Sequence, residues 1–191
     1  NPAMNILDGK LYVNTSDSGW NTRDSKIMQY DIAGDNWTEI TDNGTTFAGS
    51  QVFGNYRYNN QDVLIYQNYV NNAWQYYYLT PDAVIHRLGT IASTYGGSFV
   101  NLGERLFFYS HPSLSEVSTT DGALTDLTST FAPTAQSVAI ESIVETNGNL
   151  VMMAMIYDSS AIPANVQHLY KWSGTGAISQ LGTISPIAGG N

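Results

Sequence analysis

The chain has 191 residues, of which 42% are hydrophobic and 12% charged, and its 16 acidic against seven basic residues give a net charge of −9. This apolar content is enough to build a folded core, which excludes a disordered chain. Seven basic residues are too few to neutralise a run of phosphates, so we expect neither nucleic acid nor an anionic membrane surface as a partner.

The absence of cysteine and of long apolar runs, and the scarcity of basic residues, exclude further kinds of site and location. The chain has no cysteine, which excludes disulfides, thiolate nucleophiles and cysteine-ligated zinc. The longest apolar run, residues 150–157, is too short to span a bilayer, so we expect no membrane insertion. Few Lys and Arg among abundant Asn, Ser, Thr and Tyr favour a secreted or cell-surface protein.

A polar turn followed by an apolar run recurs four times along the chain. The apolar runs begin at Leu11, Val63, Leu106 and Leu150, at intervals of 52, 43 and 44 residues. Residues 88–91, Leu-Gly-Thr-Ile, also recur 93 positions later, an offset of two such intervals. We therefore divide the chain into four repeats, at about residues 1–46, 47–93, 94–135 and 136–191.

Each repeat is predicted to form four short strands, joined by turns that contain Gly, Asn or Asp. In the first repeat we expect strands at 3–7, 11–15, 26–32 and 36–41, and in the second at 51–58, 63–69, 73–79 and 84–89. In the third we expect them at 98–102, 105–110, 114–119 and 124–128, and in the fourth at 139–146, 150–157, 166–172 and 178–183. Residues 132–144 could also form a helix, but their position in the repeat favours a strand.

The second strand of each repeat is a continuous apolar run, which is typical of strands covered on both faces. Four-stranded repeats at this spacing are typical of β-propeller blades. We therefore predict an all-β, β-propeller-like fold of four repeats with about four antiparallel strands each, in a single domain over residues 1–191. A β-sandwich is the alternative. Four blades can close into a ring, belong to a larger ring or protein, or join a second chain in a ring of eight.

The first repeat carries the motif of a known repeat family. Residues 7–13, Leu-Asp-Gly-Lys-Leu-Tyr-Val, are followed by Tyr30-Asp31 and then by Trp37. This order of a strand pair, a Tyr-Asp step and a later Trp resembles a Kelch-type repeat. The double glycine of that family is missing after Val13, where Asn14 follows instead.

The fourth repeat, with residues 147–150 and 168–175, is similar to bacterial extracellular propeller repeats, and the other two repeats match by spacing. The resemblance implies a propeller that serves as a binding scaffold, without catalytic residues. Three tryptophans fall in third or fourth strands, where we expect them to pack: Trp37, Trp74 and Trp172.

One rim of such a fold carries the longer connections, which follow the second strands and join the repeats. Trp20 is the most distinctive residue there, because an indole beside Asn21 and Arg23 can stack on a sugar ring while its neighbours bind hydroxyl groups. Packing of Trp20 against its own loop is the alternative. The connections between repeats add Phe47, Tyr95 and Phe131. The ligand-binding residues that we expect are Trp20, Asn21, Arg23, Tyr69, Asn72, Tyr95 and His111.

Asp17 and Asp24 flank the same loop and could hold calcium, which is the one cofactor that we consider. The alternative is that both carboxylates are simply solvated. HExxH, GxSxG and P-loop motifs are absent from the sequence, which favours binding over catalysis. We expect a non-enzymatic extracellular binding or adhesion module for a surface glycan or protein. The alternatives are a structural subunit of an extracellular assembly, including a homo-oligomer, and a glycan-active enzyme.

Overall fold

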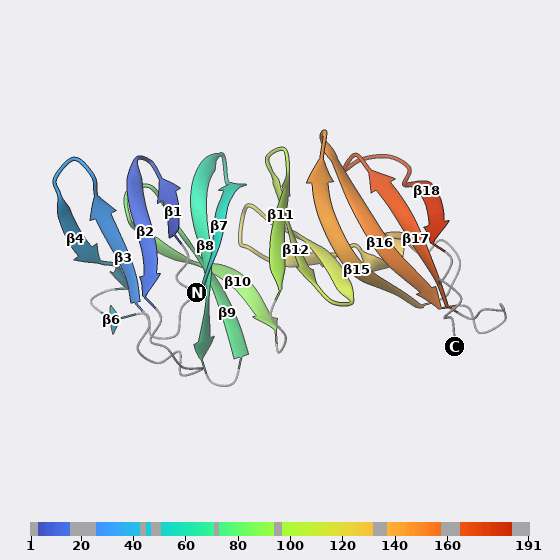
Figure 1. The fold of residues 1–191 in the computed structure, drawn as a ribbon. Coiled ribbons are helices and arrows are strands. Elements are labelled where there is room, and N and C mark those ends of the chain that lie inside the picture. Colours follow the sequence, from blue (N-terminus) through green and yellow to red (C-terminus); the bar gives the residue numbers. More distant parts are fainter. Residues whose placement is uncertain are drawn as a thin grey trace, which may run out of the picture. The chain divides into compact units, whose positions relative to one another are not determined.

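A computed structural model describes residues 4–15, 26–42, 45–46, 51–70, 73–93, 97–131, 137–157 and 165–184. Most of these residues form antiparallel strands, in four four-stranded sheets and a small sheet of β5 (Thr41–Asp42) and β6 (Thr45–Thr46). Each four-stranded sheet is a meander of consecutive strands (Figure 1). This confirms the all-β, β-propeller-like fold with four repeats, and it differs from a Greek-key sandwich, in which the chain crosses between sheets.

The chain divides into two compact units, of which the first contains residues 1–96 and 118–123. Its sheet 1 consists of β1 (Met4–Leu7), β2 (Lys10–Thr15), β3 (Lys26–Asp31) and β4 (Asn36–Glu39). Its sheet 2 consists of β7 (Gln51–Tyr58), β8 (Gln61–Val70), β9 (Ala73–Leu79) and β10 (Ile85–Ser93). The two sheets pack together around a core that contains Leu7, Tyr12, Ile27, Ile40, Leu64, Tyr66 and Leu79.

The second unit contains residues 97–117 and 124–191. Its sheet 3 consists of β11 (Ser98–Leu102), β12 (Arg105–Ser110), β13 (Ser113–Val117) and β14 (Leu124–Asp126). Its sheet 4 consists of β15 (Ser137–Thr146), β16 (Asn149–Tyr157), β17 (Asn165–Trp172) and β18 (Ser179–Ile184). A short 3-10 helix, η2 (Thr128–Phe131), precedes β15. The core contains Leu102, Phe107, Leu114, Phe131, Ile140, Leu150, Met152, Ala154, Tyr170 and Trp172.

The predicted strands agree closely with the observed ones. Four of them, at 51–58, 73–79, 98–102 and 105–110, coincide with β7, β9, β11 and β12. The strand favoured over a helix near residues 132–144 is confirmed, since β15 begins at Ser137. The helix η2 was not expected, and β14 is shorter than predicted because the chain turns into η2 after it. The single domain over 1–191 stays a prediction.

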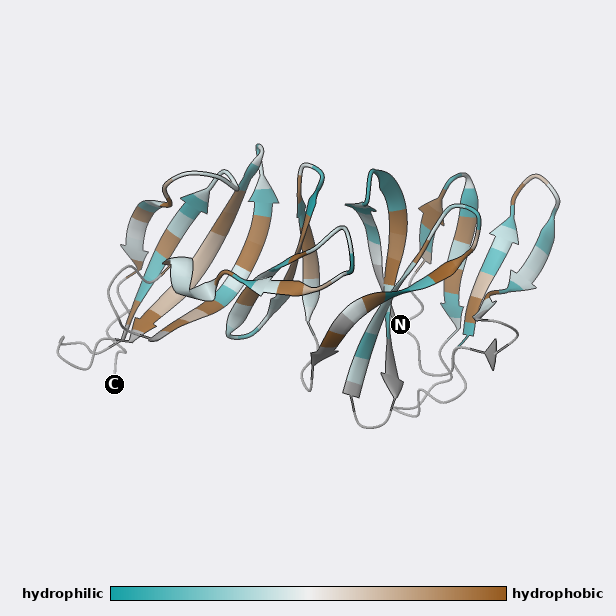
Figure 2. Ribbon diagram, turned by 180° about the vertical axis from the view of Figure 1, so that it is seen from behind, coloured by the Kyte–Doolittle hydropathy of each residue, from teal (hydrophilic) through white to brown (hydrophobic). Residues whose placement is uncertain are grey.

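The hydrophobic pattern explains why these strands form sheets covered on both faces. Val63, Leu64, Ile65 and Tyr66 of β8 are all fully buried, although neighbouring residues of a strand point to opposite faces. Hydrophobic stretches lie along strands of all four sheets (Figure 2). Among the residues described, no helix has the length and apolar character needed to cross a membrane.

Candidate binding site

The rim residues predicted to bind a ligand fall mostly outside the described part of the chain. This applies to Trp20, Asn21, Arg23, Asn72 and Tyr95, and to the calcium candidates Asp17 and Asp24. The backbone of Tyr69 lies in β8, paired with Trp74 of β9, and its side chain is not among those described. Within the described ranges, His, Asp and Glu form no group of three or more that could hold a metal ion.

His111 is the predicted rim residue whose surroundings the structure describes. It lies exposed in the turn between β12 and β13, and its Nε2 is 3.4 Å from Oε1 of Glu141 on β15. The hydroxyl of Tyr109 donates to the carbonyl oxygens of Ile140 and Glu141 at 3.0 and 2.8 Å, and the Ile140 N–H donates to the Pro112 carbonyl at 2.9 Å. Burial, and then the Glu141 charge, raises the pKa of Tyr109, so this donor keeps its proton at neutral pH. An imidazole and a carboxylate are thus held side by side.

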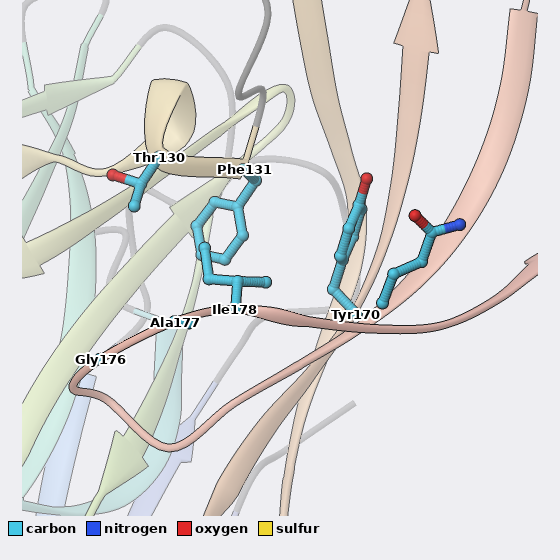
Figure 3. A pocket seen from close by; sticks show the side chains of 7 residues that line it. Thr130, Phe131, Tyr170, Gly176, Ala177 and Ile178 are labelled. Carbon is cyan, nitrogen blue, oxygen red and sulfur yellow. The ribbon is translucent and has the colours of Figure 1, made fainter.

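A second candidate site is a pocket of about 380 Å³ in the second unit (Figure 3). This volume falls at the lower end of the range of small-molecule sites, about 300–1,000 Å³. The lining comes from η2, β17, the connection 173–178 and the start of β18. The lining residues are Thr130, Phe131, Tyr170, Gly176, Ala177, Ile178 and Gln180.

The apolar wall of the pocket is fixed by aromatic packing behind it. Phe131 is 1% exposed and meets the ring of Trp172 edge to face, with centroids 5.9 Å apart. Trp172 in turn packs edge to face on Phe107, at 5.8 Å. Ile178 is partly buried against the same core. Because these side chains are held from behind, they form a preformed wall rather than a mobile one.

The polar groups of the pocket come from Thr130, Tyr170 and Gln180. The Gln180 amide nitrogen lies 2.7 Å from Nδ1 of His168 and 3.2 Å from Oγ1 of Thr183, contacts that orient the amide. Burial raises the pKa of Tyr170, so its hydroxyl stays protonated and can donate. No residue of the described lining is Asp, Glu, Lys, Arg or His. Hydrocarbon surface next to neutral hydroxyl and amide groups suits a neutral ligand rich in hydroxyl groups.

Sequence patterns missed this pocket for a physical reason. The connection 173–176 has the composition of a simple turn, and Phe131 was expected on the rim. The structure corrects the second point: Phe131 is buried in the core of the second unit, because η2 turns its ring inward onto Trp172. Phe131 and Tyr170 belong to the same core and line the same pocket, and no local motif encodes that arrangement.

No protein-family model matches this chain, and no curated protein matches it. Solved structures similar to it include a B. thetaiotaomicron extracellular domain assigned to a hybrid two-component system, with 10% identity and a TM-score of 0.49. Two others are the GH43B protein of the Bacteroides ovatus xyloglucan PUL (12% identity, TM-score 0.41) and streptogramin B lyase (15%, 0.40).

The matches cover 93%, 97% and 98% of this chain. The chain itself spans 21% and 41% of the length of the two Bacteroides chains, and 70% of the lyase. The strand order of the four sheets is the observation that defines the class of this protein, an all-β, propeller-like fold.

Proposed function

We propose that this protein is a non-enzymatic, extracellular binding module that holds a neutral saccharide in the pocket beside η2. The observation that carries the proposal is the lining, in which Tyr170 and Ile178 lie beside the Thr130 hydroxyl and the Gln180 amide. A sugar ring presents C–H groups to apolar side chains and hydroxyl groups to polar ones, and the absence of charge in the described lining suits a neutral ligand.

The rim belongs to the same proposal as a second contact, for a longer glycan or a surface protein. Its residues are Trp20, Asn21, Arg23, Tyr69, Asn72, Tyr95 and His111. The described part of the rim supports this, since His111 and Glu141 offer a donor and acceptors next to each other. Weak binding at each site would gain strength from several contacts at once.

The secreted or cell-surface location and the likeness to Kelch-type repeats are also proposed. The low content of Lys and Arg supports the location. The Kelch-like motif is supported by Tyr30 and Trp37, which pair across β3 and β4 with ring centroids 4.9 Å apart. The Trp that follows the Tyr-Asp step in the sequence therefore contacts that same Tyr.

The test is a glycan-array screen, followed by calorimetric titration with the best neutral oligosaccharide. Ala177→Trp, at an exposed position of the lining, should block the pocket, and Gln180→Ala should remove the oriented amide. The matched control is Ala33→Trp, the same change at an exposed residue of the turn between β3 and β4. We expect the affinity to fall about tenfold or more in both pocket variants, which corresponds to a loss of about 1.4 kcal/mol or more of binding free energy. The affinity of the control should stay unchanged.

Trp20→Ala, measured with calcium and again with EDTA, separates the pocket from the rim. Loss of binding in Trp20→Ala with unchanged binding in both pocket variants would place the saccharide on the rim and refute the pocket. Sensitivity to EDTA would support calcium at Asp17 and Asp24. Absence of binding to every glycan would refute the saccharide and leave a protein ligand.

A further inference from the structure

The two faces of each four-stranded sheet can be told apart by position along its second strand. We call the face that carries the third residue of that strand the front, and the face that carries the second and fourth residues the back. In the first unit, Tyr12, third in β2, shares a core with Leu64, fourth in β8. The front of sheet 1 therefore packs on the back of sheet 2.

The second unit follows the same rule. Phe107 is the third residue of β12, and it shares a core with Leu150 and Met152, the second and fourth residues of β16. The front of sheet 3 thus packs on the back of sheet 4. Both observed pairings join a front to a back, which is how identical blades stack in a propeller.

The back of sheet 1 is apolar and open to solvent. One row across its four strands is Ile6, Leu11, Tyr30 and Trp37, and the next is Met4, Val13, Met28 and Glu39. Met4, Ile6 and Trp37 are 69%, 58% and 54% exposed. Among the described elements of the first unit, none covers this face, whereas the opposite face is buried in the core.

The front of sheet 4 is the complementary face. Its rows contain Val144, Val151 and Lys171, and then Ser142, Met153 and Leu169. Val144 is 56% exposed, and Lys171 is exposed as well. Leu150 and Met152, on the back of the same sheet, are fully buried.

We propose that the back of sheet 1 binds the front of sheet 4 of a second copy of this chain. The contact would repeat the front-to-back pairing found in both units, and it would bury the exposed apolar rows of both faces. Glu39 on the back of sheet 1 already pairs with Lys26 at 2.8 Å, so Lys171 of the other face would meet an ion pair there and not a lone carboxylate. Because the contact joins two different surfaces it is heterologous, and a ring that closes after two copies would contain eight blade-like sheets.

The first measurement is the mass in solution, by size-exclusion chromatography with light scattering at several concentrations. One chain has a mass of 20.9 kDa, and we expect twice this mass. Ile6→Lys on one face and Val144→Lys on the other should each weaken association at least tenfold, because each buries an unpaired charge in the contact. Val84→Lys is the control, since Val84 is a similarly exposed valine, at 44%, that lies in the turn before β10.

Mixing the two face variants tests the front-to-back geometry itself. Ile6→Lys keeps an intact sheet 4 and Val144→Lys keeps an intact sheet 1, so the mixture regains one good contact and should dimerise where each variant alone does not. Circular dichroism and melting of each variant establish that it is folded, which both exposed positions should permit. If Ile6→Lys fails to fold, Trp37→Lys on the same face replaces it.

Three results would overturn the proposal. A wild-type mass of 20.9 kDa at every concentration would mean that no second copy binds. Loss of the dimer in one variant only would indicate a contact between two identical faces. A dimer that survives both substitutions, or that Val84→Lys removes equally, would place the interface elsewhere.

Discussion

The hydroxyl of Tyr58 donates a hydrogen bond of 2.8 Å to the carbonyl oxygen of Ser118, 60 residues further along the chain. Tyr58 ends β7 and is 3% exposed. Ser118 begins the turn 118–123, which follows β13 but belongs to the first unit. The bond therefore fixes that turn to sheet 2.

The pH dependence of stability should report this contact. Burial, followed by the charges of Tyr78 and Asp121, raises the pKa of Tyr58 to about 12, against about 10 for a tyrosine in the unfolded chain. Between these values the folded protein keeps a proton that the unfolded chain loses, so the free energy of unfolding falls by about 2–3 kcal/mol as the pH rises through this range.

Tyr58→Phe removes the titrating group. At pH 7 we expect the free energy of unfolding of the variant to be about 1 kcal/mol below that of the wild type, because the Ser118 carbonyl loses its donor. Between neutral and strongly alkaline pH, the free energy of unfolding should fall less in the variant than in the wild type. Urea unfolding of both proteins at neutral pH and near pH 11 measures the two effects. An equal alkaline loss in wild type and variant would show that Tyr58 is not the group that titrates.

A close backbone approach holds the other end of the same turn. Gly122 has φ +70°, and a Cβ there would lie 2.7 Å from the Gly89 nitrogen and 3.1 Å from the Leu88 carbonyl carbon. Gly122→Ala should therefore lower the free energy of unfolding by about 2–4 kcal/mol in total, because alanine disfavours the left-handed backbone conformation and its Cβ would clash with these atoms. Thermal or urea unfolding gives the value.

Gly103→Ala is the matched control for that clash. Gly103 has φ +60°, but an added Cβ meets no atom within 4 Å, so only the conformational cost of about 1 kcal/mol applies. The difference between the two variants isolates the contact between residues 88–89 and 122. Equal losses would contradict the packing described for this turn.

Arg105 should be sensitive even to replacement by lysine. Its Nε and Nη2 donate to the two carboxylate oxygens of Glu116 at 2.6 and 2.7 Å, and Nη1 donates to the Gly174 carbonyl. The guanidinium also lies over the rings of Phe107 and Trp172, 5.0 and 5.5 Å from their centroids. Lysine keeps the charge but loses the fork geometry and the stacking, so Arg105→Lys should destabilise the protein by about 1–2 kcal/mol in urea unfolding.

Arg57→Lys gives the comparison for an exposed pair. Arg57 contacts Asp62 through one nitrogen at 3.4 Å, and the Asp62 side chain is 71% exposed. Such a pair contributes little, so this substitution should change stability by less than about 0.5 kcal/mol. A similar loss in both variants would mean that the forked contact of Arg105 adds nothing.

The strands were predictable because their signals are local. The turn Asn59-Asn60 and the continuous apolar run that begins at Val63 delimit β7 and β8, and the predicted strand 51–58 coincides with β7. The pocket was not predictable, since Phe131 and Tyr170 lie in different repeats and are brought to one pocket only by the packed core. Trp37 is a partial failure of the sequence reasoning: it contacts Tyr30 as a packing residue would, yet 54% of it is exposed because its face of sheet 1 is open.

The hairpin of β13 and β14 has its strands in one unit and its turn in the other. A chain cut after residue 96 would therefore take the Ser118 carbonyl away from Tyr58 and the Gly122 backbone away from Gly89. A first unit moved between proteins at that boundary would lose these two contacts unless residues 118–123 moved with it. A duplication or deletion of repeats that preserved stability would have to carry the borrowed turn along with the blades that it completes.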